Sequence, residues 1–179
     1  MTKTGEETTM AREDGPNIGV ASRENGEEGL AAWSDVSQSY TLVSHALERK
    51  IREQFGLPLA GYDVLAQLAK TPEGERIRMQ ELARRVLLSK SGLSQLFSRL
   101  ERRGLVERRG DPENLRVTYA TITAVGREAL ERAQPAFHEE VEERFAGHLD
   151  EEEVRVLRRA MRKVIRASGD EPLSEGAND

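Results

Sequence analysis

The sequence predicts a mainly α-helical protein with one small β-hairpin. Most apolar residues recur at steps of three and four, the spacing that places side chains on one face of a helix. Two short stretches rich in strand formers, LVERR and VTYATIT, instead flank the turn sequence GDPENLR, which is typical of a hairpin. The chain has 179 residues and no cysteine, so we expect one domain with tails and a core that needs no disulfides.

Both ends of the chain are predicted to be disordered, and the N-terminal tail is acidic. Residues 1–30 and 169–179 hold few large apolar side chains, so they cannot bury enough surface to offset the entropy lost on ordering. The folded part is then 31–168. The N-terminus has no basic-then-apolar signal pattern, and no segment approaches the roughly 20 apolar residues that cross a bilayer. We therefore expect a cytoplasmic protein with no membrane partner.

The first predicted helix covers about 33–55. Its apolar stripe consists of Val36, Tyr40, Val43, Leu47, Ile51 and Phe55. Gly56 is a stop signal, and Pro58 suits the first turn of a second helix at about 58–70. The turn sequence TPEGE follows, and the RIR after it is a possible edge strand.

Two short helices are predicted next, at about 79–86 and 90–103. Ser89 is a good N-cap for the second of them, and Gly104 supplies a typical helix end. The second helix buries its apolar face, which consists of Leu93, Leu96, Phe97 and Leu100. Two helices joined by a tight turn and followed by a hairpin follow the order of a winged helix-turn-helix domain, at about 58–123.

The remaining helices are predicted over about 124–168. Thr123 can cap the first of them, which carries an apolar stripe from Leu130 to Phe145. The acidic sequence LDEEE opens the last helix, where negative charge is favourable to the helix dipole.

Positive charge is concentrated in the middle of an acidic chain. The formal net charge is -5, yet the segment from Arg76 to Arg116 holds eleven Lys or Arg and five Asp or Glu, a local charge of +6. The rest of the chain must then carry -11. A basic segment that coincides with the predicted helix-turn-helix indicates a nucleic-acid partner despite the bulk acidity.

The outer face of the 90–103 helix suits the major groove of double-stranded DNA. Small hydroxyl side chains permit close approach, Gln95 can pair with a base edge, and arginines can bind guanine or phosphate. Free N–H groups at the helix start can hold a phosphate. The predicted contacts of this helix and its cap are Ser89, Lys90, Ser91, Ser94, Gln95, Ser98, Arg99 and Arg102.

The hairpin is predicted to add a second contact with DNA. Arg108 and Arg109 lie at its base, where they can reach phosphates. Arg116 lies in its turn, from which an arginine can enter the narrow minor groove. The alternative to DNA binding is that these arginines merely form a solvated helix face. It explains each arginine singly, but it does not explain why the capped helix pair, the basic face and the hairpin occur together.

The block from MQELARR to GREAL resembles a MarR-family transcriptional regulator. The features that carry the resemblance are ELA, LSKSGLSQL, RLERRGLVERR, the wing, and Ile122, Thr123 and Gly126. The resemblance implies an obligate homodimer. In it, the helices at about 33–55 and 124–168 of both chains would form the dimerisation domain. Their apolar stripes support this, because a helical pair alone would leave them exposed. It also implies a repressor that reads a pseudo-palindromic operator and is released by an effector.

The wing departs from the usual family pattern at one position. The family's wing commonly reads DPxDxR, whereas this chain has DPENLR, with Asn114 in place of the second aspartate. The wing arginine is retained as Arg116. Asparagine accepts a hydrogen bond without charge assistance, so we expect Arg116 to be less firmly oriented.

The resemblance also implies a small, often aromatic, effector between the dimer helices and the DNA-binding lobe. The candidate lining residues are Trp33, Tyr40, His45 and Tyr62. Core or interface positions are the competing interpretation for each of them. His138 and His148 lie about 280° apart around a helix, so no metal site or other cofactor is expected.

Two other classes of function compete with a regulator. An enzyme is not expected, because the sequence has no HExxH, GxSxG, Walker A or GxGxxG pattern. The alternative is a helical protein-interaction adaptor that has lost specific DNA binding. Salt-dependent, sequence-preferring binding of DNA would distinguish the regulator from the adaptor.

Overall fold

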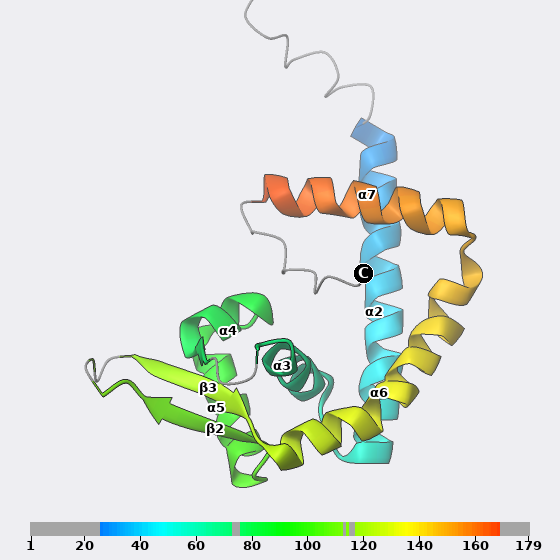
Figure 1. Ribbon diagram of the computed structural model, residues 1–179. Coiled ribbons are helices and arrows are strands. Elements are labelled where there is room, and N and C mark those ends of the chain that lie inside the picture. Colours follow the sequence, from blue (N-terminus) through cyan, green and yellow to red (C-terminus); the bar gives the residue numbers. More distant parts are fainter. Residues whose placement is uncertain (1–25, 73–75, 113, 115–116, 169–179) are drawn as a thin grey trace, which may run out of the picture. The chain divides into compact units, whose positions relative to one another are not determined.

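The computed structural model describes residues 26–72, 76–112, 114 and 117–168 (Figure 1). In chain order the elements are α2 (Gly26–Phe55), α3 (Leu59–Ala69), β1 (Ile77–Arg78), α4 (Met79–Arg85), α5 (Lys90–Arg102), β2 (Val106–Gly110), β3 (Thr118–Ile122), α6 (Ala124–Arg144), the 3-10 turn η1 (Ala146–His148) and α7 (Glu151–Ala167). The chain divides into two compact units, residues 1–40 and 41–179. The fold is mainly helical with one small sheet, as the sequence predicts.

The first helix is longer than the sequence pattern predicts. It begins at Gly26, with Glu27 and Glu28 in its first turn, where negative charge is favourable to the helix dipole. The prediction of disorder through residue 30 is therefore wrong for 26–30. Residues 1–25 and 169–179 lie outside the described part of the chain, and their disorder stays a prediction.

The second unit is built on a three-stranded antiparallel sheet in the order β1-β3-β2. β1 pairs Ile77 with Ala120 and confirms the possible edge strand of the sequence. The core under the sheet comes from α3, α4, α5 and the end of α2. Its fully buried side chains include Ile51, Leu57, Val64, Leu65, Leu82, Leu93, Phe97, Leu100 and Val106. The four apolar residues predicted for the inner face of α5 are all buried.

The predicted helix caps are confirmed. Ser89 Oγ accepts a hydrogen bond from Gly92 N at 3.0 Å and starts α5. Thr123 Oγ1 accepts from Gly126 N at 3.0 Å and starts α6, and the same hydroxyl donates to the Gly104 carbonyl at 2.6 Å. Thr123 thus ties the start of α6 to the turn that ends α5.

Gly126 is required by the packing of α6 against this turn. A Cβ at this position would lie 2.0 Å from the Leu105 carbonyl oxygen, far inside van der Waals contact. The backbone of α6 therefore approaches the start of the wing more closely than any side chain would permit.

The turn between α4 and α5 contains a strained residue. Leu87 has a φ of +54°, in the left-handed region, and its side chain is 77% exposed. Non-glycine residues adopt this conformation at a cost, and neighbouring contacts must hold them there. Here Leu87 N donates to Arg84 O and Leu88 N to Ala83 O, which close the turn.

An ionic cluster around one buried carboxylate, Glu140, joins α2 to α6. Lys50 Nζ lies 2.8 Å from Glu139 Oε2 and 3.1 Å from Glu140 Oε2, and Arg144 Nε lies 3.2 Å from Glu140 Oε1. Glu140 is only 4% exposed. Burial opposes its ionisation, but the hydrogen bonds and charges of Lys50 and Arg144 outweigh burial and hold the pKa of Glu140 below its ordinary value.

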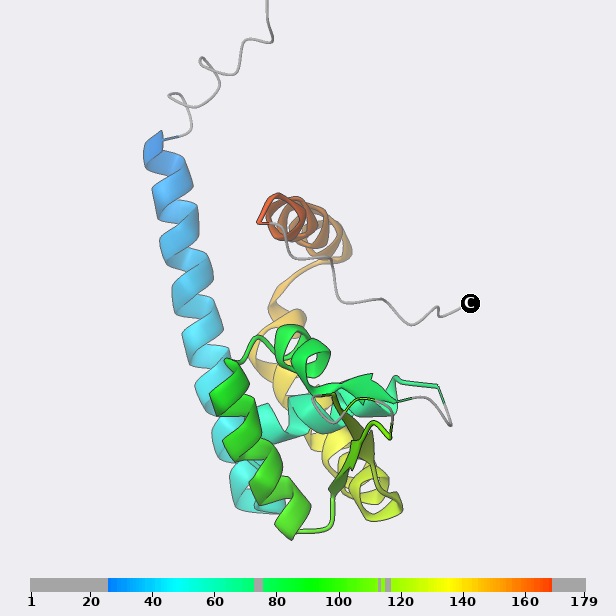
Figure 2. The same cartoon turned by 90° about the vertical axis from the view of Figure 1, so that its left-hand side faces the viewer.

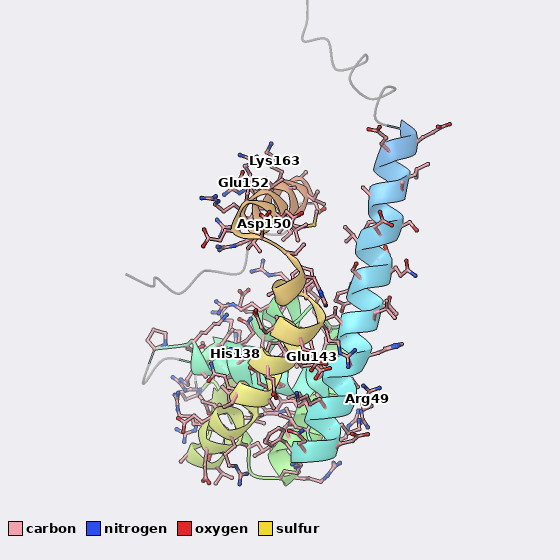
Figure 3. The ribbon with its side chains drawn as sticks, turned by 90° about the vertical axis from the view of Figure 1, so that its right-hand side faces the viewer. Arg49, His138, Glu143, Asp150, Glu152 and Lys163 are labelled. Carbon is pink, nitrogen blue, oxygen red and sulfur yellow. The ribbon has the colours of Figure 1, made fainter. Side chains whose placement is uncertain are left out.

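The last helix has an apolar face that the described part of the chain leaves partly uncovered. A capping box of Asp150 and Glu153 starts α7. Figure 3 views α7 nearly along its axis and labels Asp150, Glu152 and Lys163 on it. None of the residues of α7 is buried. The apolar face consists of Val154, Leu157, Met161, Val164 and Ile165. Within the described ranges no helix is long and apolar enough to cross a membrane.

Candidate nucleic-acid interface

The outer face of α5 is open to solvent. Figure 2 shows this helix in the foreground, with no other element in front of it. Most of the predicted contacts on it have exposed side chains, namely Lys90, Ser91, Ser94, Gln95, Arg99 and Arg102. The opposite side of the helix is packed into the core, so α5 presents a rigid polar and cationic surface. These are the properties of a helix that enters the major groove.

Three of the predicted serine contacts form hydrogen bonds within the protein. Ser89 Oγ caps α5 and lies 3.2 Å from Ser91 Oγ. Ser98 is half-buried, and its hydroxyl donates to the Ser94 carbonyl at 2.9 Å. These side chains shape the helix and its start, whereas Ser94 and Gln95 keep their side chains exposed on the outer face.

Arg108 lies against α5 instead of extending into solvent. Its Nη2 donates to Ser94 O at 2.9 Å and to Ser98 Oγ at 3.0 Å. Its guanidinium lies 5.0 Å from the centroid of the Phe97 ring, a cation–π contact. Glu101 Oε1 accepts from Arg108 N at 3.1 Å, which adds a backbone link between the two elements. Arg108 therefore fixes α5 to the wing.

Arg109 points to the opposite face of the sheet. Successive strand residues alternate between faces, so Val106 and Arg108 face the core and α5 while Glu107 and Arg109 face away. Arg109 Nη2 pairs with Glu107 Oε2 at 3.1 Å. Arg108 and Arg109 therefore lie on different sides of the hairpin. That each of them reaches a DNA phosphate stays a prediction.

Asp111 organises the wing turn. Its Oδ1 accepts from Asn114 N at 3.1 Å, and its Oδ2 accepts from the Tyr119 hydroxyl, also at 3.1 Å. Two backbone hydrogen bonds, Asp111 N to Val117 O and Val117 N to Asn114 O, close the turn. Asp111, the first aspartate of the family pattern, thus holds the base of the turn through these hydrogen bonds. The second aspartate of that pattern is replaced by Asn114. Arg116 itself lies outside the described residues.

Sequence reasoning missed the roles of Asp111 and Tyr119. Aspartate before proline is a recognised turn former whose side chain accepts hydrogen bonds from backbone N–H groups further along the chain. The role of Asp111 in the turn could therefore have been predicted from the sequence. The hydrogen bond from Tyr119 to Asp111 could not be predicted in this way, because it depends on the pairing register of β2 with β3.

The four predicted effector residues lie in different environments. Tyr62 is buried in the core of the second unit and stacks on Phe137, with ring centroids 4.4 Å apart, and burial raises the pKa of Tyr62. His45 is exposed on α2. Trp33 and Tyr40 belong to the first unit and are exposed there. The competing interpretation, a core position, is the observed one for Tyr62.

The described part of the chain shows no cluster of three or more His, Asp or Glu side chains that could hold a metal ion. The groups exposed at α5 and the wing are hydroxyls, an amide, the Lys90 amine and guanidinium groups. Their placement on a helix packed beside a hairpin defines a winged helix-turn-helix protein of the DNA-binding class.

Comparisons with known proteins agree with this class. The MarR-family profile matches residues 55–116. The transcriptional regulator HosA of Escherichia coli O111:H- is 33% identical over 106 residues, which cover 59% of this chain and 76% of HosA. An HTH-type transcriptional regulator of Bacillus cereus is 31% identical over 139 residues, which cover 76% of this chain and 88% of the relative.

A similar solved structure contains DNA. It is Sco3205, a MarR family transcriptional regulator from Streptomyces coelicolor in complex with DNA, with 33% identity and a TM-score of 0.73. The match covers 82% of this chain and 93% of Sco3205. The chain therefore belongs to the MarR family of transcriptional regulators, which are not enzymes.

Proposed function

We propose that this regulator is a homodimeric repressor that binds a pseudo-palindromic operator and is released by a small-molecule effector. The observation that carries the DNA-binding part is the exposed outer face of α5, held beside the wing by Arg108. The complex of Sco3205 with DNA supports DNA binding by this chain.

Within this proposal the residues of α5 divide into two roles. Gln95 is placed to read a base edge, and the small side chains of Ser91 and Ser94 permit the close approach that this requires. Arg99 and Arg102 are exposed at the other end of the helix, where they can hold phosphates or a guanine. Lys90 and the free N–H groups at the helix start favour a further phosphate.

The wing contributes through two arginines with different tasks. Arg116 is proposed to enter the minor groove, from a turn that Asp111 holds at its base. Arg108 is proposed to act indirectly, because its guanidinium is engaged by Ser94 and Ser98 and thereby sets the position of α5.

The homodimer is supported by apolar surface that the protomer leaves uncovered. In α7, Val164 is 57% exposed and Ile165 42% exposed, on the same face as Met161. An exposed stripe of this kind marks a protein–protein interface. A two-fold dimer would place two α5 helices about one DNA turn apart and so read two related half-sites.

Repression and release by an effector are expectations from the family resemblance. Of the four predicted effector residues, Tyr62 does not support a pocket, because its ring is buried in the core and stacks on Phe137. His45, Trp33 and Tyr40 keep exposed side chains that are available to a partner or a ligand.

The proposal is tested by selecting genomic DNA fragments that the full chain binds. We expect the enriched fragments to share a pseudo-palindrome, and the affinity for them to fall steeply with salt as counterions are released. Scrambled fragments of the same length and base composition serve as the control. Equal binding of selected and scrambled DNA, or none at all, would instead favour a helical adaptor that acts through protein contacts.

A further inference from the structure

Leu87, in the turn between α4 and α5, combines two unfavourable features. Its φ of +54° lies in the left-handed region, and no other non-glycine residue of the described ranges has a positive φ. Its side chain is 77% exposed, more than any other large apolar side chain in the described part of the chain. Both features cost free energy, and so exposed a side chain gains little packing in return. Strain that is kept in this way is a reason to look for a function at the residue.

The backbone around Leu87 holds the turn in this conformation. Leu87 N donates to Arg84 O at 3.3 Å, and Leu88 N donates to Ala83 O at 2.9 Å. Val86 and Leu88, the neighbours on either side, are partly buried and pack against the core. The flanking side chains therefore turn inward, whereas the side chain of Leu87 is left in solvent.

Contacts on both sides of the turn fix it without the Leu87 side chain. At the end of α4, Arg85 Nε lies 3.0 Å from Glu81 Oε1, and Arg84 pairs with the other oxygen of the same carboxylate. The hydrogen bond from Arg85 and the charges of both arginines outweigh burial and hold the pKa of Glu81 below its ordinary value. At the start of α5, Ser89 supplies the cap. The Leu87 side chain is thus available to a partner.

The position of Leu87 along the chain places it beside the DNA that α5 is proposed to bind. It precedes the N-cap of α5, Ser89, by two residues and the exposed Ser91 by four. In helix-turn-helix proteins the first residues of the second helix contact the base edges, so the turn that leads into this helix also lies close to DNA. This step rests on the proposed function.

The chemistry of the major groove narrows what an aliphatic side chain can recognise there. The base edges present hydrogen-bond donors and acceptors, and thymine adds a 5-methyl group. Leucine has no polar group, so contact with a donor, an acceptor or a phosphate would remove water from that group and offer no hydrogen bond. Contact with the thymine methyl buries apolar surface on both partners and is favourable.

We propose that Leu87 is a specificity-determining residue that recognises a thymine in each half-site by contact with its 5-methyl group. It complements Gln95, which is placed to form hydrogen bonds with a base edge. The two contacts differ in kind, so they can be separated by experiment. Removal of a methyl group from the DNA affects the Leu87 contact and leaves every hydrogen-bonding group of the bases in place.

The inference is tested with the full chain and DNA selected from genomic fragments. Single thymines are replaced by deoxyuridine, which pairs as thymine does but lacks the methyl group, and fluorescence anisotropy measures affinity. We expect one replacement in each half-site to weaken binding by wild type about fourfold, the effect of one lost methyl contact. Leu87→Ala should bind unmodified DNA about four- to tenfold more weakly and lose nothing further on that replacement.

Two further variants and a stability measurement complete the design. Leu87→Met keeps an apolar side chain and should retain both the affinity and the deoxyuridine penalty. Val125→Ala is the matched control, because Val125 is also exposed, at 57%, but lies in the first turn of α6. It should bind like wild type. Chemical denaturation of Leu87→Ala should give the free energy of unfolding of wild type, because alanine keeps the same strained turn and the lost side chain is exposed.

The possible results separate the methyl contact from other roles of Leu87. A deoxyuridine penalty of equal size in wild type and Leu87→Ala would overturn the contact, as would the absence of any penalty in wild type. An equal loss of affinity for selected and random DNA in Leu87→Ala would place the side chain against the DNA backbone and overturn base recognition. A matching loss of stability would make Leu87 a structural residue.

Failure of the proposed function gives a different result from failure of this contact. Each result that bears on the contact requires wild type to bind selected DNA. If wild type bound none, the DNA-binding function itself would be overturned, and the thymine contact with it.

Discussion

Gln95 is the residue from which we expect most of the sequence discrimination of α5. Its side chain is exposed on the outer face, where an amide can form paired hydrogen bonds with adenine. Gln95→Ala should lower the affinity for selected DNA by roughly 1–3 kcal/mol and change the affinity for random DNA much less. Fluorescence anisotropy with both DNAs measures the difference, and an equal drop for the two would show that Gln95 is not a base contact.

Substitution of Arg108 tests whether a side chain that does not contact DNA can affect DNA binding through the position of α5. Arg108→Ala removes the bonds to Ser94 and Ser98, so we expect a loss of about 1–2 kcal/mol in the free energy of unfolding together with weaker DNA binding. Arg109→Ala is the neighbouring control, and its exposed pair with Glu107 should contribute less than about 0.5 kcal/mol. Chemical denaturation of both variants measures this contrast, which would disappear if Arg108 were a simple surface arginine.

At the scale of elements, the ionic cluster that joins α2 to α6 makes stability depend on pH. Because the folded pKa of Glu140 lies below its ordinary value, its contribution is fully present above about pH 4.5 and is lost as pH falls through the folded pKa. Glu140→Gln should cost roughly 1–3 kcal/mol at pH 7, and the gap from wild type should narrow on acidification. Denaturation at several pH values measures it.

Glu139→Gln is the matched control for this cluster. Glu139 binds the same Lys50 amine, but its side chain is 71% exposed. Its removal should therefore change stability by less than about 1 kcal/mol at any pH. If the two glutamine variants behaved alike, burial of Glu140 would not be the cause of the pH dependence.

The turn between α4 and α5 is an element whose strain can be relieved. Asparagine tolerates the left-handed conformation better than leucine, and the exposed Leu87 side chain contributes little packing. Leu87→Asn should raise the free energy of unfolding by up to about 1 kcal/mol, whereas β-branched Leu87→Val should lower it. Thermal melts rank the three proteins, and the opposite order would show that the side chain stabilises the turn in another way.

At the scale of the whole molecule, α7 is the element most dependent on a second copy. Val164→Glu places a charge on its uncovered face without disturbing the core of the protomer, so we expect a folded protein that is mainly monomeric at micromolar concentration. Light scattering with circular dichroism tests this.

Arg159→Glu is the corresponding control, because Arg159 lies on the opposite side of α7 at 100° per residue. It should remain dimeric and bind DNA. A dimer that survives in the Val164→Glu variant would place the interface elsewhere.

The sequence by itself determined the order of the elements, the caps at Ser89 and Thr123, and the inner and outer faces of α5. These features depend on residues three or four positions apart, so local periodicity is enough to predict them. The alternation of strand residues, which places Arg108 and Arg109 on opposite faces of β2, is likewise a local property of the sequence. The start of α2 at Gly26 was missed because its first turns bury nothing and so show no apolar pattern.

Only the tertiary structure decided which distant groups meet. Arg108 reaches Ser94 across the α5–β2 turn, Tyr62 stacks on Phe137 from another helix, and Lys50 of α2 meets Glu140 of α6. Such contacts depend on strand register and on the packing of helices against the sheet, which no local pattern specifies. The physical reason is that helix caps and apolar faces depend on residues close together in the sequence. A site depends on contacts between residues far apart in the sequence, which only the packing of the elements brings together.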